Sequence, residues 1–479
     1  MSAAPARVST GVSGLDEVVG GGVLRGALVF LVGAPGVGKT VLAEQMAFHA
    51  AAGGGTVLYF TTLSEPHTKL ISNVRAFAFF DEALIGERIQ FLNLEQTLRQ
   101  GPPETADAIV EMARDQRAAL VVLDGFRSVA DFADQPVRVR EFLYRLAARL
   151  AVVGAVCLVT FEGDPFDTAL YPELATADVI LGMWHEARQV SRSRHLAVLK
   201  ARGSAPLPGA HSFVIAPDGV RCFPLPESLP APRAAAPGDG RAAFDIPGLD
   251  ALLDGGLTAA SSTVLAGSLG SGKTTLALAW LLAGARRREA GLYFGFYESE
   301  QQLVERAAVF GYNLTSALQD RSVTVRVRTP IGLDGNQLAA EIRGAVEARR
   351  IRRLVIDTGR ELERSVAPER AESYLTALMA YLRGAGVTAL VAKDTGTAVG
   401  EELDFAGSPD AALAENVILL RRLEGGSARR IVQVLKMRFS NFDAAPHELR
   451  LESGGISVGP PSDVRAAGVV ATAGHAGTD

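Results

Sequence analysis

Apolar residues in this chain gather in near-continuous runs of seven or eight positions, and segments with the apolar spacing of helices separate the runs. Such runs predict strands buried on both faces, because an exposed face would impose an alternation of apolar and polar residues. Strands are predicted at residues 27–33, 56–62, 118–124, 154–161, 262–268, 291–297, 352–358 and 387–394, and helices at residues 40–51 and 66–77. Strands alternating with helices indicate an α/β fold in which helices flank a mostly parallel, twisted sheet.

The chain carries its main motifs twice. The sequence GAPGVGKT at residues 33–40 recurs as GSLGSGKT at residues 267–274, so that Lys39 and Lys273 lie 234 residues apart (273 − 39). SGLDEVVGGGV at residues 13–23 recurs at the same offset as PGLDALLDGGL. An offset kept over widely spaced motifs indicates a gene duplication, and so two domains with one fold.

The domain boundaries follow from composition. Residues 223–243 are rich in Pro, Ala and Gly, which predicts an extended linker. The first domain then spans residues 1–222 and the second residues 244–458. Residues 459–479, rich in Gly and Ala and without apolar periodicity, are predicted to form a disordered tail.

Both glycine-rich motifs fit the pattern G-x-x-x-x-G-K-[ST], and each lies between a predicted buried strand and a predicted helix. Glycines let the backbone curl so that its N–H groups face a polyphosphate, and the following helix adds the positive end of its dipole. The lysine neutralises the terminal phosphates. We therefore expect ATP to bind at Gly33, Gly36, Gly38, Lys39 and Thr40 of the first domain and at Gly267, Gly270, Ser271, Gly272, Lys273, Thr274 and Thr275 of the second.

Two acids complete the predicted sites. Asp124 and Asp357 end apolar strands at 85 and 84 residues after the loop lysines (124 − 39 and 357 − 273). An acid in this position holds Mg²⁺ through its water shell, and the hydroxyl of Thr40 or Thr274 is a direct ligand. The sequence thus predicts Mg²⁺ beside ATP in both domains.

The order of these parts resembles the RecA-like branch of phosphate-loop ATPases and, more closely, the KaiC family of the cyanobacterial clock, whose members carry two such domains in tandem. The resemblance runs from Thr10 to about Ile456, and its markers are the GLD…GG motif ahead of each loop and VLKMR at residues 434–438. It implies an ATP-dependent homohexamer, built as a double ring with ATP at the subunit interfaces. It also implies protein signalling partners.

The resemblance further implies that a neighbouring subunit supplies a lysine and an arginine to the γ-phosphate from a K-x-R segment. In this chain the segments are Lys200 with Arg202 and Lys436 with Arg438. Residues i and i+2 of a strand share one face, so both cations of a segment can reach one anion.

At the water-activating position this chain departs from the family, which carries two adjacent glutamates after the second strand and uses the first. Here Ser64 and Tyr297 hold the first position, and only the second glutamates, Glu65 and Glu298, are kept. A serine or a phenol is a poor base for water, so we expect slow hydrolysis with the two glutamates as candidate bases. By the same resemblance, Phe310 stacks on the adenine of the second domain.

Three other functions share these motifs. One is the Ser/Thr autokinase activity of clock members, whose target residues align with Ala411 and Ala412 here. Another is a DNA-dependent ATPase of the RecA or DnaB type, which needs a basic, often aromatic, strand-binding element. The basic clusters 286–288 and 349–353 are instead predicted to be solvated helix ends. The third is a nucleotide-gated binding platform with little catalysis.

Composition narrows the classes further. With 48% hydrophobic and 21% charged residues the chain is globular, and its net charge of −5 provides no overall positive field for a nucleic acid or an anionic membrane. Its two cysteines cannot form a multi-cysteine metal site. The first residues lack the apolar core of a signal peptide, and no apolar run approaches the ~18 residues of a membrane span. We expect a cytoplasmic protein.

Overall fold

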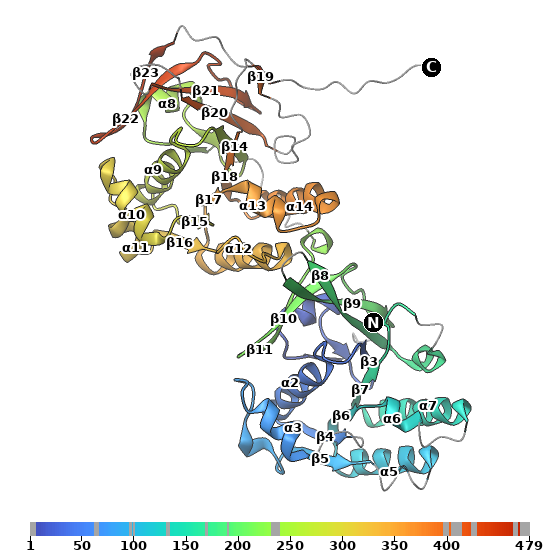
Figure 1. Ribbon diagram of the computed structural model, residues 1–479. Coiled ribbons are helices and arrows are strands. Elements are labelled where there is room, and N and C mark those ends of the chain that lie inside the picture. The colour runs from blue at the N-terminus through green and yellow to red at the C-terminus, as the bar shows by residue number, and fades with distance from the viewer. Residues whose placement is uncertain are drawn as a thin grey trace, which may run out of the picture. The chain divides into compact units, whose positions relative to one another are not determined.

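The computed structural model describes residues 6–61, 67–94, 98, 101–130, 135–167, 171–188, 191–230, 240–395, 402–403, 414–422, 429–462 and 468–469. The chain divides into two compact units, Met1–Leu229 and Pro230–Asp479. Each unit is built on its own large sheet (Figure 1).

In the first unit, nine strands of the described residues form one sheet in the order β11-β10-β9-β8-β3-β7-β6-β4-β5. They are β3 (Leu28–Gly33), β4 (Thr56–Thr61), β5 (Ile89–Asn93), β6 (Ala118–Asp124), β7 (Val156–Glu162), β8 (Val179–Arg188), β9 (Ser191–Ala201), β10 (His211–Ala216) and β11 (Gly219–Phe223). Strands β8 to β5 pair in parallel, and β9, β10 and β11 extend the sheet in antiparallel fashion. Outside it, β1 (Arg7–Val8) pairs with β2 (Val23–Leu24).

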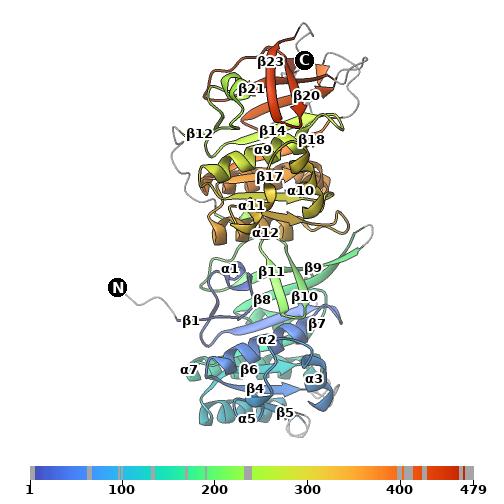
Figure 2. The same ribbon diagram turned by 90° about the vertical axis from the view of Figure 1, so that its left-hand side faces the viewer.

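Helices cover both faces of this sheet (Figure 2). Because successive strand residues point to opposite faces, Val29 and Leu31 of β3 join the apolar cluster of α2 (Lys39–Ala52), whereas Phe30 joins the opposite cluster. The opposite cluster holds α5 (Pro102–Asp115) and α7 (Pro136–Val153). The other helical segments described in this unit are α1 (Leu15–Val18), α3 (His67–Val74), α6 (Arg127–Ala130) and the 3₁₀ turns Glu82–Leu84, Pro172–Thr176 and Pro226–Ser228.

The second unit repeats this strand order, as β16-β15-β17-β18-β14-β20-β21-β22-β23. Its strands are β14 (Ser262–Gly267), β15 (Gly291–Gly295), β16 (Val323–Val327), β17 (Arg353–Asp357), β18 (Thr388–Asp394), β20 (Asn416–Arg422), β21 (Arg430–Met437), β22 (His447–Glu452) and β23 (Gly455–Pro461). Two short pairs lie outside the sheet, β12 (Arg241–Ala242) with β13 (Leu257–Thr258) and β19 (Glu402–Leu403) with β24 (Gly468–Val469).

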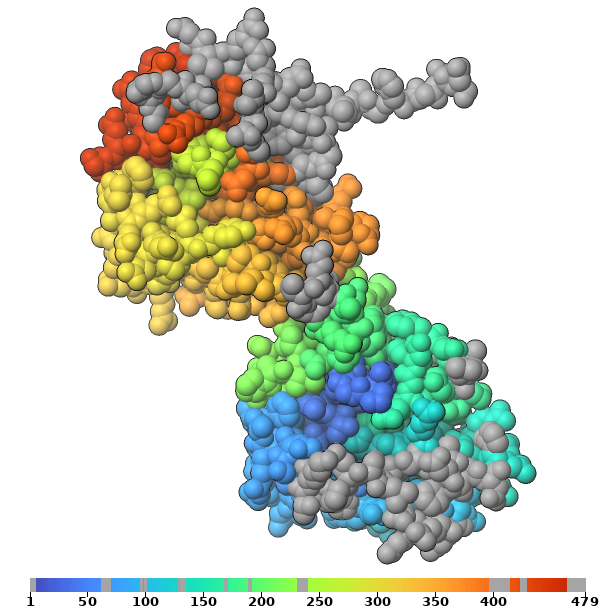
Figure 3. Space-filling view, viewed as in Figure 1, coloured from blue at the N-terminus to red at the C-terminus, as the bar shows by residue number. Residues whose placement is uncertain are grey.

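The helices of the second unit also form two layers. Trp280 of α9 (Lys273–Arg286) packs in the cluster that holds Leu265 of β14, and Ile342 of α12 (Gly335–Arg349) packs in the cluster that holds Ile356 of β17. The other described helices are α8 (Pro247–Leu252), α10 (Glu300–Val309), α11 (Leu314–Gln319), α13 (Gly359–Arg364), α14 (Ala371–Gly384) and the 3₁₀ turn Pro368–Arg370. Helices α10 and α11, yellow in Figure 3, form a continuous part of this unit's surface.

The predicted fold class is confirmed, since each unit has a mostly parallel sheet with helices on both faces. Strand β23 runs to Pro461, so ordered structure passes the predicted end of the second domain at 458. The assignment of Arg353 to a solvated helix end is wrong, because Arg353 begins β17 and is 1% exposed. Within the described residues, none of the helices combines the length and the apolar character needed to cross a membrane.

Candidate functional site

Each glycine-rich motif forms a loop between a buried strand and a helix. Gly36 and Gly38 have φ of 77° and 116°, and Gly270 and Gly272 have φ of 75° and 104°, in the left-handed region that favours glycine. A Cβ on Gly38 would also lie 2.6 Å from Ile215, and one on Gly272 would lie 2.7 Å from Leu451. Both backbone conformation and lack of space therefore require these glycines. Because α2 and α9 begin directly after the loops, their free N–H groups face the loops.

The loop lysines are buried and held by their own loops. Lys39 Nζ donates to the carbonyls of Gly33 at 2.9 Å and Ala34 at 3.0 Å. Lys273 Nζ does the same with Gly267 at 2.8 Å and Ser268 at 3.0 Å. Burial lowers the pKa of Lys39, against the raising effect of the Glu162 and Asp124 charges.

The two predicted magnesium acids lie beside the loop threonines. Thr40 Oγ1 donates to Asp124 at 3.3 Å, and Thr274 Oγ1 donates to Asp357 at 2.8 Å. Such hydroxyl and carboxylate oxygens fit the ligand preference of Mg²⁺. Burial, with a smaller contribution from the charge of Glu298, raises the pKa of the Asp357 carboxyl, so a cation there would supply the missing counter-charge.

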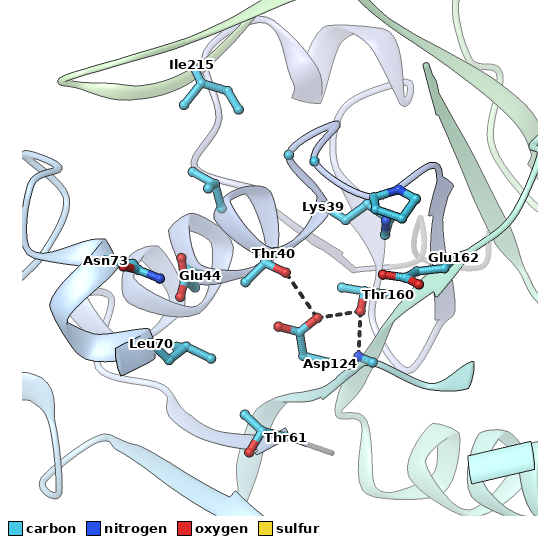
Figure 4. A pocket seen from close by; sticks show the side chains of 15 residues that line it. Lys39, Thr40, Glu44, Thr61, Leu70, Asn73, Asp124, Thr160, Glu162 and Ile215 are labelled. Carbon is cyan, nitrogen blue, oxygen red and sulfur yellow. Dashed lines mark hydrogen bonds between the residues drawn. The ribbon is translucent and has the colours of Figure 1, made fainter. Parts of the chain in front are cut away.

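A pocket of about 470 Å³ opens in front of the first loop (Figure 4). Lys39 and Thr40 line it from the loop and helix α2, Asp124 and Glu162 from the ends of β6 and β7, and Asn73 from α3. Its volume falls in the range of small-molecule and cofactor sites. The chemistry gathers where the carboxyl ends of parallel strands meet, which is where ligands bind in open α/β sheets.

The structure also brings together groups that the sequence analysis missed. Tyr59 and Tyr293 donate from the adjacent strands β4 and β15 to Asp124 and Asp357, at 3.0 and 2.9 Å. Glu162 and Asp394 end the strands beside β3 and β14. The repeat itself held the signal, because aligning the two copies pairs Tyr59 with Tyr293 and both strand-ending acids.

Of the two candidate bases, only Glu298 is within the described residues, and Glu65 and Ser64 lie outside them. Glu298 directly precedes the capping box that starts α10, formed by Ser299 and Gln302. Its carboxylate accepts a 2.7 Å hydrogen bond from Arg306 Nε, two turns along that helix. The effect of Glu298 on the Asp357 carboxyl puts it on the magnesium side of β15.

Tyr297, at the family's usual base position, is engaged elsewhere. Its hydroxyl donates at 2.7 Å to the carboxylate of Glu361, which is 3% exposed, and this bond raises the pKa of the phenol. A proton donor with a raised pKa cannot accept a proton from water near neutral pH. Phe310 caps α10 and is half-buried. Its neighbour Tyr312 contacts the pocket at the C-terminal end of α9, and the adenine role of Phe310 stays a prediction.

The two K-x-R segments lie far from the loops of their own units. Strand β8 runs parallel to β3, and Lys200 pairs with Ile180 near the start of β8. Ile180 pairs with Phe30, three residues or about 10 Å before the loop begins. Lys200 Nζ extends further away from the loop, because it donates to the carbonyl of Ala175, ahead of β8, at 2.8 Å.

The second unit shows the same arrangement. Lys436 pairs with Val417 near the start of β20, and its Nζ donates to Ala414 O at 2.7 Å. In both units the register slips just before the lysine, at Leu199 and Leu435, and a bulge of this kind re-aims the side chains that follow. Arg202 and Arg438 are exposed, and each lies close enough to lower the pKa of the neighbouring lysine, after burial.

Two phosphate loops, two strand-end acids and this sheet order define a tandem pair of RecA-like phosphate-loop ATPase domains. The chain belongs to the KaiC ATPase family, whose model matches residues 8–227 and 243–463. It is 24% identical to the circadian clock oscillator protein KaiC of Picosynechococcus sp. over 465 residues, 94% of this chain and 89% of that protein. It is also 24% identical to the circadian clock protein KaiC3 of Synechocystis sp. over 469 residues, 95% of this chain and 92% of the relative.

Proposed function

We propose that this protein binds Mg-ATP at both loops, hydrolyses it slowly at the interfaces of a cytoplasmic homohexameric double ring, and acts as a nucleotide-dependent scaffold for signalling proteins. The observation that carries the proposal is the separation of two sets of cations within each unit. Lys39 and Lys273 lie in the loops, whereas Lys200 and Lys436 lie near the opposite ends of the strands. A chain can therefore complete its triphosphate site only with cations of another copy.

Head-to-tail contacts between identical chains satisfy this geometry. A heterologous interface brings one surface of a copy against a different surface of the next, and repeated rotation closes the ring. A cation supplied in trans to the γ-phosphate accelerates phosphoryl transfer by orders of magnitude. Arg202, whose side chain is 61% exposed, and the exposed Arg438 are accessible to a neighbour.

Slow turnover follows from the groups near the water-activating position. Glu298 is the candidate base of the second unit, and its hydrogen bond to Arg306 holds it in one orientation while reducing its basicity. The same bond supports a second candidate function, a nucleotide-gated binding platform with little hydrolysis. Intact ATP binding without phosphate release would select the platform.

Light scattering after size exclusion, with and without Mg-ATP, tests the proposal together with phosphate release. The wild-type chain of 50.4 kDa is expected to reach about six times its mass with Mg-ATP and to release phosphate. Lys39→Ala and Lys273→Ala are each expected to lose nucleotide at one loop, with Lys39→Ala impairing assembly more. Arg450→Ala, which removes an exposed arginine paired with Glu448, is the control. A wild-type chain that stays monomeric and releases no phosphate would contradict the proposal.

A further inference from the structure

An acid ends the strand next to the loop strand in both units. In the first unit Glu162 of β7 pairs with Gly33, the last residue of β3. In the second unit Asp394 of β18 pairs with Gly267, the last residue of β14. Since Gly33 and Gly267 open the phosphate loops, the register puts a carboxylate at the same place beside each loop.

In the second unit this carboxylate binds the loop lysine directly. Asp394 Oδ1 lies 2.8 Å from Lys273 Nζ. The ammonium group has three N–H donors, and the chain provides three acceptors for them, the carbonyls of Gly267 and Ser268 and the carboxylate of Asp394. The lysine side chain is 8% exposed and that of Asp394 is 41% exposed, so the acid lies on the solvent side of the lysine.

We propose that Asp394, and Glu162 in the first unit, compete with the triphosphate for the loop lysine and thereby set the nucleotide affinity of each loop. This inference rests on the proposed function. A phosphate oxygen that binds Lys273 must take the N–H that Asp394 now accepts. The displaced carboxylate then stays near the phosphates as a like charge, which weakens binding further.

Glu162 fits the same role with a longer side chain. It lines the pocket of the first loop together with Lys39 and Thr40, and Figure 4 shows its carboxylate near the lysine. The negative charge of Glu162 is the largest influence that raises the pKa of Lys39 against the effect of burial. In both units, then, the anion nearest the loop lysine on this strand belongs to the protein.

The test is equilibrium binding of fluorescent ATP and ADP analogues with Mg²⁺ to the full-length Asp394→Asn variant. Lys39→Ala is added to both the variant and its reference, so that only the second loop reports. Asparagine keeps the shape of Asp394 and removes its charge, and we expect the ATP analogue to bind about three- to tenfold more tightly. The gain should be smaller for the ADP analogue, which lacks the phosphate that comes closest to the displaced charge.

Glu363→Gln is the matched control, because Glu363 pairs with Lys393, the residue next to Asp394, at 3.6 Å. It should leave both affinities unchanged. Unchanged or weaker binding by Asp394→Asn, in a chain that keeps its circular dichroism spectrum, would overturn the inference and leave the proposed function intact. Reduced phosphate release at unchanged affinity would also overturn it, because the acid would then act on water. No nucleotide binding by the wild-type chain would remove the proposed function itself.

Discussion

Tyr293 donates a 2.9 Å hydrogen bond to Oδ2 of Asp357, the same oxygen that accepts the 2.8 Å bond from Thr274. The first unit repeats the contact with Tyr59 and Asp124. A carboxylate that is almost fully enclosed in protein keeps its charge only if donors surround it. These tyrosines, which come from the neighbouring strand and are themselves buried, are therefore part of the metal site rather than of the apolar core alone.

Replacement of Tyr293 by phenylalanine should make magnesium binding at the second loop more sensitive to acid. Burial already raises the pKa of Asp357, and the Tyr293 bond opposes this by favouring the ionised form. Removing the bond raises the pKa further, so protonation, and with it loss of Mg-ATP, begins at a higher pH as the pH falls. Binding titrations between about pH 5 and pH 8 in a Lys39→Ala chain measure the midpoint. Tyr312→Phe is the control, and equal midpoints for Tyr293→Phe and its parent would refute the role.

Glu298→Gln should lower phosphate release by the second unit about 10²- to 10⁴-fold if that carboxylate activates water. The substitution keeps the size of the side chain and an oxygen that can accept the Arg306 hydrogen bond, so α10 stays in position. Single-site turnover is read in chains carrying Lys200→Ala and Arg202→Ala to silence the first unit. Glu305→Gln, on the exposed face of the same helix, is the control. Unchanged turnover would reject Glu298 as the base.

The loops and their acids could be predicted from sequence because their constraints are local. Glycines with positive φ, a lysine at a helix start and an acid at the end of an apolar strand are all visible within short segments, and the duplication gives each prediction a second instance. The direction of the K-x-R cations could not be predicted in this way. It depends on the pairing of β9 with β8 and on a bulge that shifts the register by one residue.

Arg353 and Asp394 show the other limit. Arginines in a basic run are usually solvated, but Arg353 is buried because acceptors from distant segments meet it: Ala243 O at 2.7 Å and Trp280 O at 2.8 Å. Asp394 meets Lys273 only through the parallel register of β14 and β18. Contacts between residues more than 70 positions apart follow from the packed sheet and leave no periodic pattern in the sequence.

Arg353→Leu should destabilise the second unit by about 2–4 kcal/mol, because two buried carbonyls and the Glu289 carboxylate lose their donor. The guanidinium also lies 5.0 Å from the ring centre of Trp280, a contact that leucine cannot replace. Chemical unfolding followed by Trp280 fluorescence in a Trp184→Phe background reports on this unit, since the chain has 2 tryptophans. The neighbouring, exposed Arg352→Leu should change stability by less than about 0.5 kcal/mol. Equal effects of the two substitutions would contradict the buried role.

The assignment of Lys436 and Arg438 to a neighbour's site makes a prediction that cis action does not share. One chain carries Lys273→Ala, and another carries Lys436→Ala with Arg438→Ala; both also carry Lys200→Ala and Arg202→Ala, which silence the first unit but keep Lys39 for assembly. Each chain alone should release almost no phosphate. An equal mixture should recover about a quarter of the activity of the Lys200→Ala, Arg202→Ala parent, because one interface in four joins an intact loop to intact cations.

Recovery must depend on exchange of subunits between rings, so it should grow with time after mixing and stop when the rings are cross-linked before mixing. The same mixture with Glu448→Gln in place of the Lys436 and Arg438 substitutions is the control, since Glu448 pairs with Arg450 at the surface and leaves the cations in place. Its second chain should be active alone. A cross-linkable mixture that forms mixed rings and stays inactive would show that Lys436 and Arg438 do not serve the loop of a neighbouring chain.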